Sequence, residues 1–193
     1  MTQHMEPMVF SLGGEPRISK LYRYTLCGLD NVYLCSGFTQ EKINGEIYTS
    51  VKNAEDLHMI IALRLSALRR PLLGKEITFL RKQLRITQEE LAKHFDVSRK
   101  TVSEYEREIS RMPRPSQMLL QINVAKSLFD IIHQMHNNDD PSVVQFLPAI
   151  DEFLNYAITL NEAFYEQGRP ELPPAFLADA AIGNWKMSRD GMC

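Results

Sequence analysis

The chain has 193 residues, of which 44% are hydrophobic, and a formal net charge of −2, so it can bury the core of one large or two small globular domains. Its longest apolar runs are too short to span a bilayer, and its first residues lack the basic start and apolar run of an export signal. Three cysteines are too few for a disulfide-stapled secreted domain, and we therefore expect a cytoplasmic protein.

Charge is distributed unevenly along the chain. Residues 64–115 hold 13 basic and 7 acidic side chains, a net charge of +6, whereas residues 1–63 carry −2 and residues 116–193 carry −6. A basic segment between acidic flanks is where a polyanion would bind. We therefore expect any nucleic-acid site in the middle third.

The first part of the chain predicts an arm followed by a small sheet. Residues 1–20 mix Gly, Pro and Met without a clear period, which is typical of a poorly specified arm. Aromatic and β-branched residues in 21–26 and 32–35 flank a turn-forming stretch, which predicts a hairpin. Asn44-Gly45 predicts another turn before an alternating strand at 47–51. Together these segments favour an antiparallel sheet.

Helical periodicity dominates the remainder. A helix beginning near Asp56 should pack on one face of the sheet, and another is expected from about Gly74 to Leu84. The predicted fold class is α+β, mainly α: a small N-terminal antiparallel sheet with a helix, a central helical bundle and C-terminal helices. The expected segments are an arm (1–20), a sheet-plus-helix domain (21–68), the central bundle (69–136) and a C-terminal helical extension (141–193), with helices at 143–165 and around 176–181.

Residues 87–106 have the pattern of two short helices joined by a tight turn. Thr87 and Glu90 have the spacing of a capping box, which starts the first helix. Asp96 occupies the turn position that needs a left-handed backbone, and Ser98 suits the N-cap of the second helix. The stretch therefore predicts a helix-turn-helix, and residues 69–136 are expected to form a DNA-binding domain.

The second helix of this motif should read DNA. Val102 and Tyr105 are expected to face inward, three residues apart. The opposite face then offers four side chains to base edges in the major groove: Arg99, Lys100, Ser103 and Glu104. The DNA backbone would be held by Lys93, Ser98, Thr101, Arg107 and Arg111.

The stretch from Arg81 to Glu106 resembles the Xre/Cro-type helix-turn-helix, with the Thr-Gln-Glu-Glu-Leu-Ala entry and the Val-Ser-x-x-Thr-Val-Ser-x-Tyr-Glu exit of that family. The resemblance implies that Gln88 contacts a phosphate. It also implies a structural ion pair between Arg81 and Glu106. Regulators of this type usually bind two-fold half-sites, so a homodimeric repressor is expected.

A wider stretch, residues 22–115, is similar to bacterial regulators grouped with MqsA-type antitoxins. It includes the segment from Tyr22 to Leu34 and the Pro-Leu-Leu-Gly-Lys-Glu run before the central motif. The similarity implies a DNA-binding, usually dimeric and often autorepressing protein. The named antitoxin of that group has a four-cysteine zinc site, whereas this chain has only Cys27 and Cys35 in the corresponding region. We therefore expect no metal and no cofactor.

Two functions remain open. No nucleophile elbow, phosphate-binding glycine loop or paired His and acid motif is present, so an enzyme is not expected. The first function is a sequence-specific transcriptional regulator, a homodimeric repressor bound to double-stranded DNA on a bacterial nucleoid. The alternative is an antitoxin-like or adaptor protein that binds a toxin-like or other partner through its flanking regions and uses DNA binding for autoregulation. Neither involves a membrane.

Overall fold

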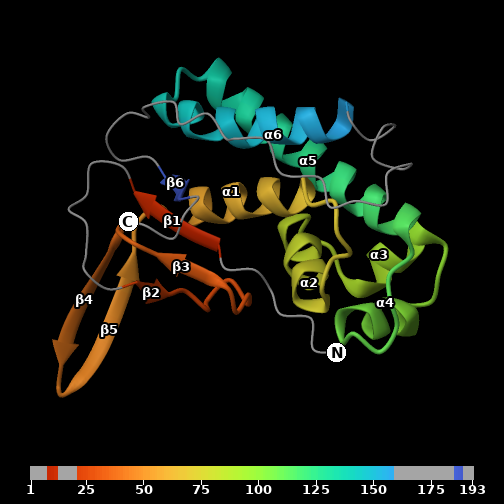
Figure 1. Ribbon diagram of the computed structural model, residues 1–193, viewed down its shortest axis with the longest axis horizontal. Helices are drawn as coiled ribbons and strands as arrows, with labels where there is room; N and C mark the ends of the chain where they lie inside the picture. Colours follow the sequence, from red (N-terminus) through yellow and green to blue (C-terminus); the bar gives the residue numbers. More distant parts are fainter. Residues whose placement is uncertain (1–7, 13–20, 159–184, 189–193) are drawn as a thin grey trace. The chain divides into compact units, whose positions relative to one another are not determined.

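The computed structural model describes residues 8–12, 21–158 and 185–188 (Figure 1). The chain divides into two compact units. The first contains Met1–His58 together with Asp179–Cys193, and the second contains Met59–Ala178. The expected helix at 176–181 lies outside the described residues. The predicted fold class, α+β and mainly α, is confirmed.

The first unit contains a four-stranded sheet in the order β2-β3-β1-β6. Its strands are β1 (Met8–Leu12), β2 (Tyr22–Arg23), β3 (Val32–Leu34) and β6 (Trp185–Ser188). The expected hairpin is present as the antiparallel pair β2 and β3, but β1 runs parallel to β3 and antiparallel to β6. The prediction of a wholly antiparallel sheet was therefore wrong in this respect.

β1 lies within residues 1–20, which were expected to form a poorly specified arm, but it is largely buried in this sheet. Phe10 is fully buried, and the Ser36 hydroxyl accepts from the Leu12 amide at 2.8 Å. Trp185, at the start of β6, donates from its indole nitrogen to the carbonyls of Lys52 and Asn53 at 3.2 and 3.1 Å. The expectation of a poorly specified arm was thus wrong for β1, because its apolar residues gain their partners from distant parts of the chain.

A separate hairpin, β4 (Phe38–Ile43) and β5 (Glu46–Val51), follows the sheet (Figure 1). Asn44 and Gly45 form its turn with φ values of +53° and +90°, as a two-residue hairpin turn requires. The Asn-Gly prediction is confirmed. Cys35, which precedes this hairpin, is buried and disulfide-bonded, so Cys27 is the free cysteine in the described part of the chain.

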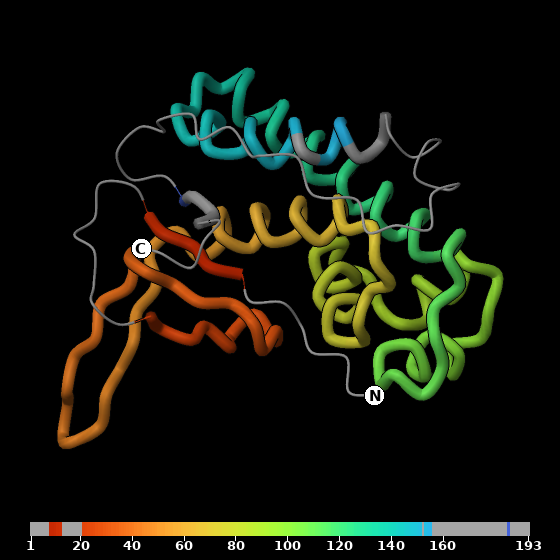
Figure 2. The backbone as a smooth tube through the Cα atoms, in the orientation of Figure 1, coloured from red at the N-terminus to blue at the C-terminus, as the bar shows by residue number. Residues whose placement is uncertain are grey.

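Helices make up the described part of the second unit (Figure 2). In chain order these elements are α1 (Ala54–Ser66), which begins in the first unit, α2 (Gly74–Gln83), α3 (Gln88–Phe95), α4 (Arg99–Glu106), α5 (Arg114–Asn137), the 3-10 helix η1 (Pro141–Phe146) and α6 (Leu147–Ile158). The helix expected from Val143 is thus preceded by a 3-10 helix that starts at Pro141, and its α-helical part starts at Leu147. No helix among the described residues is both long and apolar enough to cross a membrane.

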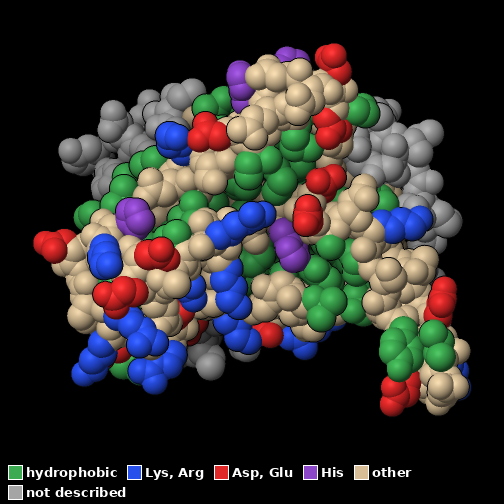
Figure 3. All heavy atoms as spheres, turned by 180° about the vertical axis from the view of Figure 1, so that it is seen from behind, with side chains coloured by type: hydrophobic (Ala, Val, Ile, Leu, Met, Phe, Trp, Pro, Cys, Tyr) green, Lys and Arg blue, Asp and Glu red, His purple; other side chains and the backbone are tan. Residues whose placement is uncertain are grey.

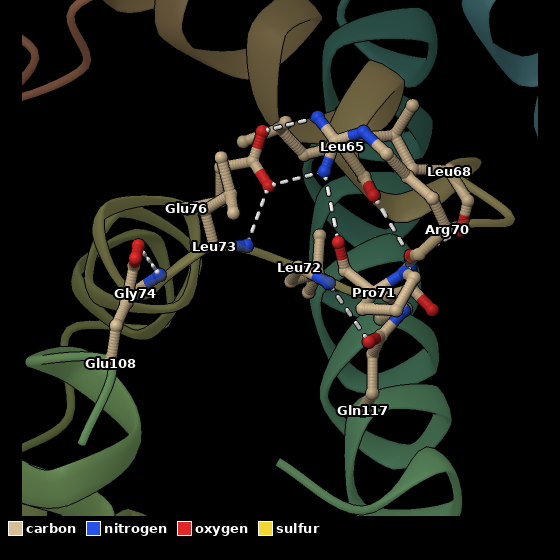
Figure 4. Close-up of polar contacts among 11 residues, drawn as sticks. Leu65, Leu68, Arg70, Pro71, Leu72, Leu73, Gly74, Glu76, Glu108 and Gln117 are labelled. Carbon is tan, nitrogen blue, oxygen red and sulfur yellow. Dashed lines mark hydrogen bonds and ion pairs between the residues drawn. The ribbon is translucent and has the colours of Figure 1, made fainter. Parts of the chain in front are cut away.

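Side chains of α5 fix the connection between α1 and α2 (Figure 4). The Gln117 amide accepts from the Leu72 amide at 3.0 Å and donates to the Arg70 carbonyl at 2.9 Å. Arg70 in turn pairs with Glu76, whose fully buried carboxylate also accepts from the Leu73 amide at 2.9 Å. Because a buried carboxylate is costly without such partners, this network sets where α2 begins.

Candidate nucleic-acid interface

The helix α3 starts at a complete capping box. The Thr87 hydroxyl accepts from the Glu90 amide at 3.2 Å, and the Glu90 carboxylate accepts from the Thr87 amide at 2.7 Å. The Thr87 amide and the Thr87 hydroxyl both donate to the Glu90 carboxylate, and these two bonds lower the pKa of the Glu90 carboxyl. Leu91 and Ala92 are buried on the inner face of α3. The sequence prediction for this helix start is confirmed.

The turn between α3 and α4 depends on one left-handed residue. Asp96 has φ +53° and ψ +47°, as its position in the motif predicted. The Val97 amide donates to the Ala92 carbonyl at 3.0 Å, which completes a Schellman-type C-terminal turn. Ser98 then caps α4 by accepting from the Thr101 amide at 3.1 Å. Two residues therefore separate the left-handed turn from the first residue of α4.

Burial of two side chains sets the rotation of α4. Val102 is fully buried, and Tyr105 is nearly so. Since successive residues of an α-helix are 100° apart, the side opposite this pair carries Lys100, with Ser103 and Glu104 on either side of it. The remaining candidate, Arg99, is the first residue of α4 and lies at the edge of that side. The four side chains expected to face bases thus share the outward half of α4.

Two of these candidates interact with each other. The Lys100 ammonium lies 3.8 Å from the Glu104 carboxylate, one helical turn away. Lys100 is exposed and Glu104 is half-buried, so the pair is weak and can separate when another partner approaches. Glu104 can therefore accept from a base amino group only if its contact with Lys100 is shared or lost.

An ion pair joins α2 and α4. The Arg81 guanidinium of α2 donates to the Glu106 carboxylate of α4 through Nε at 2.5 Å and Nη2 at 3.2 Å, and through Nη1 to the Ile86 carbonyl at 2.8 Å. The Gln88 amide nitrogen donates to Glu106 Oε2 at 2.8 Å. One carboxylate therefore connects α2, α3 and α4.

The sequence did not predict the bond between Gln88 and Glu106. The resemblance assigned Gln88 to a phosphate alone. A primary amide has two N–H donors, so one can bind Glu106 while the other remains for a phosphate. The signal in the sequence was the polar side chain of Gln88 at the first helical position of α3, which faces the same end of α4 as Arg81.

A second missed contact holds the loop after α4. Glu108 is left-handed, with φ +59°, and its carboxylate accepts from the Gly74 amide at 2.8 Å, at the start of α2 (Figure 4). A Cβ added to Gly74 would overlap the Glu106 carbonyl oxygen. Gly74 thus permits α2 and α4 to approach closely, and Glu108 accepts from the first helical amide of α2, beside the Leu73 amide that Glu76 already satisfies.

The residues expected to hold the DNA backbone differ in their surroundings. Lys93, Ser98, Arg107 and Arg111 are exposed. Thr101 is half-buried, and its hydroxyl lies 2.9 Å from the Ser98 hydroxyl, where it supports the cap of α4. Lys and Arg side chains gather at the lower left of Figure 3, over the helix-turn-helix. The described residues contain no group of three His, Cys, Asp or Glu side chains placed to hold a metal ion.

Two short helices, α3 and α4, joined through a left-handed residue and with Arg99 and Lys100 exposed on α4, have the arrangement of a helix-turn-helix. The family model described as "Helix-turn-helix" matches residues 77–124, which contain α3 and α4 entirely. That family is a DNA-binding regulatory domain and not an enzyme family, so the match supports a DNA-binding regulator. No curated protein and no solved structure is significantly similar to the chain.

Proposed function

We propose that the protein is a sequence-specific transcriptional regulator that binds double-stranded DNA as a homodimeric repressor. The observation that carries this proposal is the orientation of α4, which buries Val102 and Tyr105 and leaves a basic, polar face outward. A helix of eight residues is about 12 Å long, similar to the width of the major groove of B-DNA at about 12 Å.

Each outward side chain has a chemistry that suits DNA. Arg99 can donate to O6 and N7 of guanine, and Lys100 to either a base or a phosphate. Glu104 can accept from N4 of cytosine, and Ser103 can contact several bases. Around them, backbone binding would come from Gln88, Lys93, Ser98, Thr101, Arg107 and Arg111. Of these, Thr101 acts through the Ser98 cap, because its hydroxyl is already engaged there.

The ion pair between Arg81 and Glu106 stabilises the position of α4, which carries this surface. It fixes the end of α4 and the start of α3 in one arrangement, so the side chains that meet DNA need little ordering on binding. Glu106 is thereby a structural residue and takes no part in reading bases.

The dimer follows from the size of the reading surface. One recognition helix contacts only a few base pairs, and a two-fold dimer doubles the site to two half-sites separated by one helical turn. A dimer on such an operator excludes other proteins from the same DNA, which is the basis of repression.

Selection of binding sites from random duplex DNA tests the proposal directly. The full-length chain should enrich a palindrome whose half-sites lie about 10 base pairs apart. An operator placed across a promoter should then reduce transcription when the protein is expressed. Failure to enrich any sequence over unselected DNA would contradict the proposal.

The β4–β5 hairpin favours a second candidate function, an antitoxin-like or adaptor role in the wider group that residues 22–115 resemble. Ile43, Ile47 and Tyr48 are exposed near its tip. By the strand register, Ile43 and Tyr48 share a face with Glu41 and Glu46. An isolated two-stranded hairpin is marginal in water, and a partner with a basic, apolar surface would cover both kinds of side chain.

Co-expression with the product of a neighbouring small reading frame tests this second function. A complex should form, and Ile43→Asp with Tyr48→Asp should abolish it while leaving operator binding unchanged. Persistence of the complex in that double variant would rule out the hairpin as its interface.

A further inference from the structure

The loop after α4 presents an apolar side chain beside the proposed reading surface. Ile109 is 62% exposed, and the exposed Arg107 and Arg111 flank it. A single exposed apolar residue is ordinary on a protein surface. The position of this one, within a basic loop that directly follows the recognition helix, is not explained by the fold.

The helices α2, α3 and α4 end in the same type of turn, so the residues that follow them can be compared with one another. Left-handed residues follow α2, α3 and α4, and in each case the next amide donates back into the last turn of its helix. The three bonds are Ile86 to Arg81 at 3.4 Å, Val97 to Ala92 at 3.0 Å and Ile109 to Glu104 at 2.9 Å. In this type of turn the donating residue usually makes an apolar contact with its own helix.

Ile109 is the exception among the three. Ile86 and Val97 are half-buried, but Ile109 is exposed. The positions of α4 that it would contact are Ser103 and Glu104, which are polar. Packing against α4 therefore does not account for an isoleucine at this position.

The loop holds Ile109 in one place. Glu108 is anchored to the Gly74 amide at 2.8 Å (Figure 4), and the Ile109 and Ser110 amides both donate to the Glu104 carbonyl, at 2.9 and 3.4 Å. A side chain presented by a fixed loop loses little conformational entropy when it meets a partner.

DNA chemistry offers one apolar group to such a side chain. The C5-methyl of thymine lies in the major groove and is recognised by apolar contact. With α4 spanning about the width of the groove, the loop at its end reaches the wall of the groove, where Arg107 and Arg111 can bind phosphates. We propose that Ile109 contacts a thymine methyl group at the edge of each half-site and determines specificity at that position.

This inference rests on the proposed function and can fail separately from it. The experiment uses the full-length chain and the operator recovered by selection. Each thymine in a half-site is replaced in turn by deoxyuridine, which removes only the methyl group. Dissociation constants are measured for the wild-type chain and for Ile109→Ala. The control is Ile47→Ala, which truncates another exposed isoleucine, 68% exposed, on the β4–β5 hairpin.

At one thymine, loss of the methyl group should weaken the wild-type chain and Ile47→Ala by about fourfold, the effect expected for one buried methyl group. The same deoxyuridine should have no effect on Ile109→Ala. Equal deoxyuridine effects in the wild-type chain and Ile109→Ala at every thymine would overturn the inference while the regulator function stands. If selection yields no operator, the proposed function fails and this inference with it.

Discussion

The Arg81 guanidinium and the Glu106 carboxylate form a bidentate ion pair across 25 residues of chain, and both side chains are largely buried at 12% and 7% exposure. Glu106 accepts a further bond from Gln88, so its carboxylate is held by groups from two other helices, with Arg81 supplying the opposite charge. The pair fixes the position of α4 relative to α2. Its loss should therefore lower both the free energy of unfolding and the affinity for DNA.

Removal of the Glu106 carboxylate by Glu106→Ala should cost about 3–5 kcal/mol in the free energy of unfolding, because Arg81 then keeps a charge without its partner. Urea denaturation measures the change. The matched control is Asp130→Ala, which breaks the exposed pair with Lys126 (73% and 62% exposed) and should cost no more than about 0.5 kcal/mol. Equal costs in the two variants would mean that the buried pair has no special structural role.

A residue without a side chain at position 96 should make the left-handed turn between α3 and α4 more stable. Asp96→Gly removes the steric cost of a side chain at φ +53° and should stabilise the chain by about 0.5–1 kcal/mol. Asp96→Ala retains a Cβ and should give no gain. Thermal unfolding of the two variants distinguishes them, and a greater stability of the alanine variant would show that backbone strain at this turn is unimportant.

The close packing around Gly74 leaves no room for a side chain at this position. Gly74→Ala places a Cβ against the Glu106 carbonyl and should destabilise the fold by about 1–3 kcal/mol, although alanine favours helix formation. Lys75→Ala, at the next and exposed position, should change stability by less than about 0.5 kcal/mol. The prediction fails if chemical denaturation gives the same midpoint for both variants.

His58 should make stability depend on pH. Burial lowers the pKa of its imidazole below the usual value of about 6.5, and its Nε2 lies 2.8 Å from the hydroxyl of Tyr24, whose pKa burial raises to about 12. The unfolded chain therefore binds a proton more readily than the native protein, so this contribution to stability is complete above the unfolded pKa and is lost as the pH falls below about 6.5.

His58→Gln should flatten the loss of thermal stability between pH 7.5 and 5.5, whereas His136→Gln, at an exposed position, should not. If both variants lost stability as steeply as the wild-type chain, the half-buried His58 would make no contribution to the pH dependence.

Local chemistry made the centre of the chain predictable. The Thr87 capping box, the left-handed Asp96 and the Ser98 cap each depend on residues within three or four positions, and the structure has all of them. The burial of Val102 and Tyr105 followed from helical spacing alone. These features fixed the orientation of α4 without knowledge of its neighbours.

Long-range partners were not predictable in the same way. The strand at Met8–Leu12 pairs with Val32–Leu34 and with Trp185–Ser188, and its own five residues carry no alternating pattern that would announce a strand. In the sequence, nothing distinguishes Glu108 from a solvated glutamate in a basic segment. Only in the folded chain does α2 bring the Gly74 amide within hydrogen-bonding distance of the Glu108 carboxylate. Both depend on tertiary contacts, which periodicity does not encode.

The central claim is that α4 reads DNA sequence, and Arg99→Ala on the selected operator tests it most directly. Fluorescence anisotropy should give a loss of about 1–3 kcal/mol in binding free energy, with reduced discrimination at one base pair. Lys93→Ala, a backbone-contact variant, should weaken binding to all sequences alike and reduce its salt dependence. Unchanged affinity and unchanged base preference in Arg99→Ala would contradict the proposed orientation of α4 on DNA.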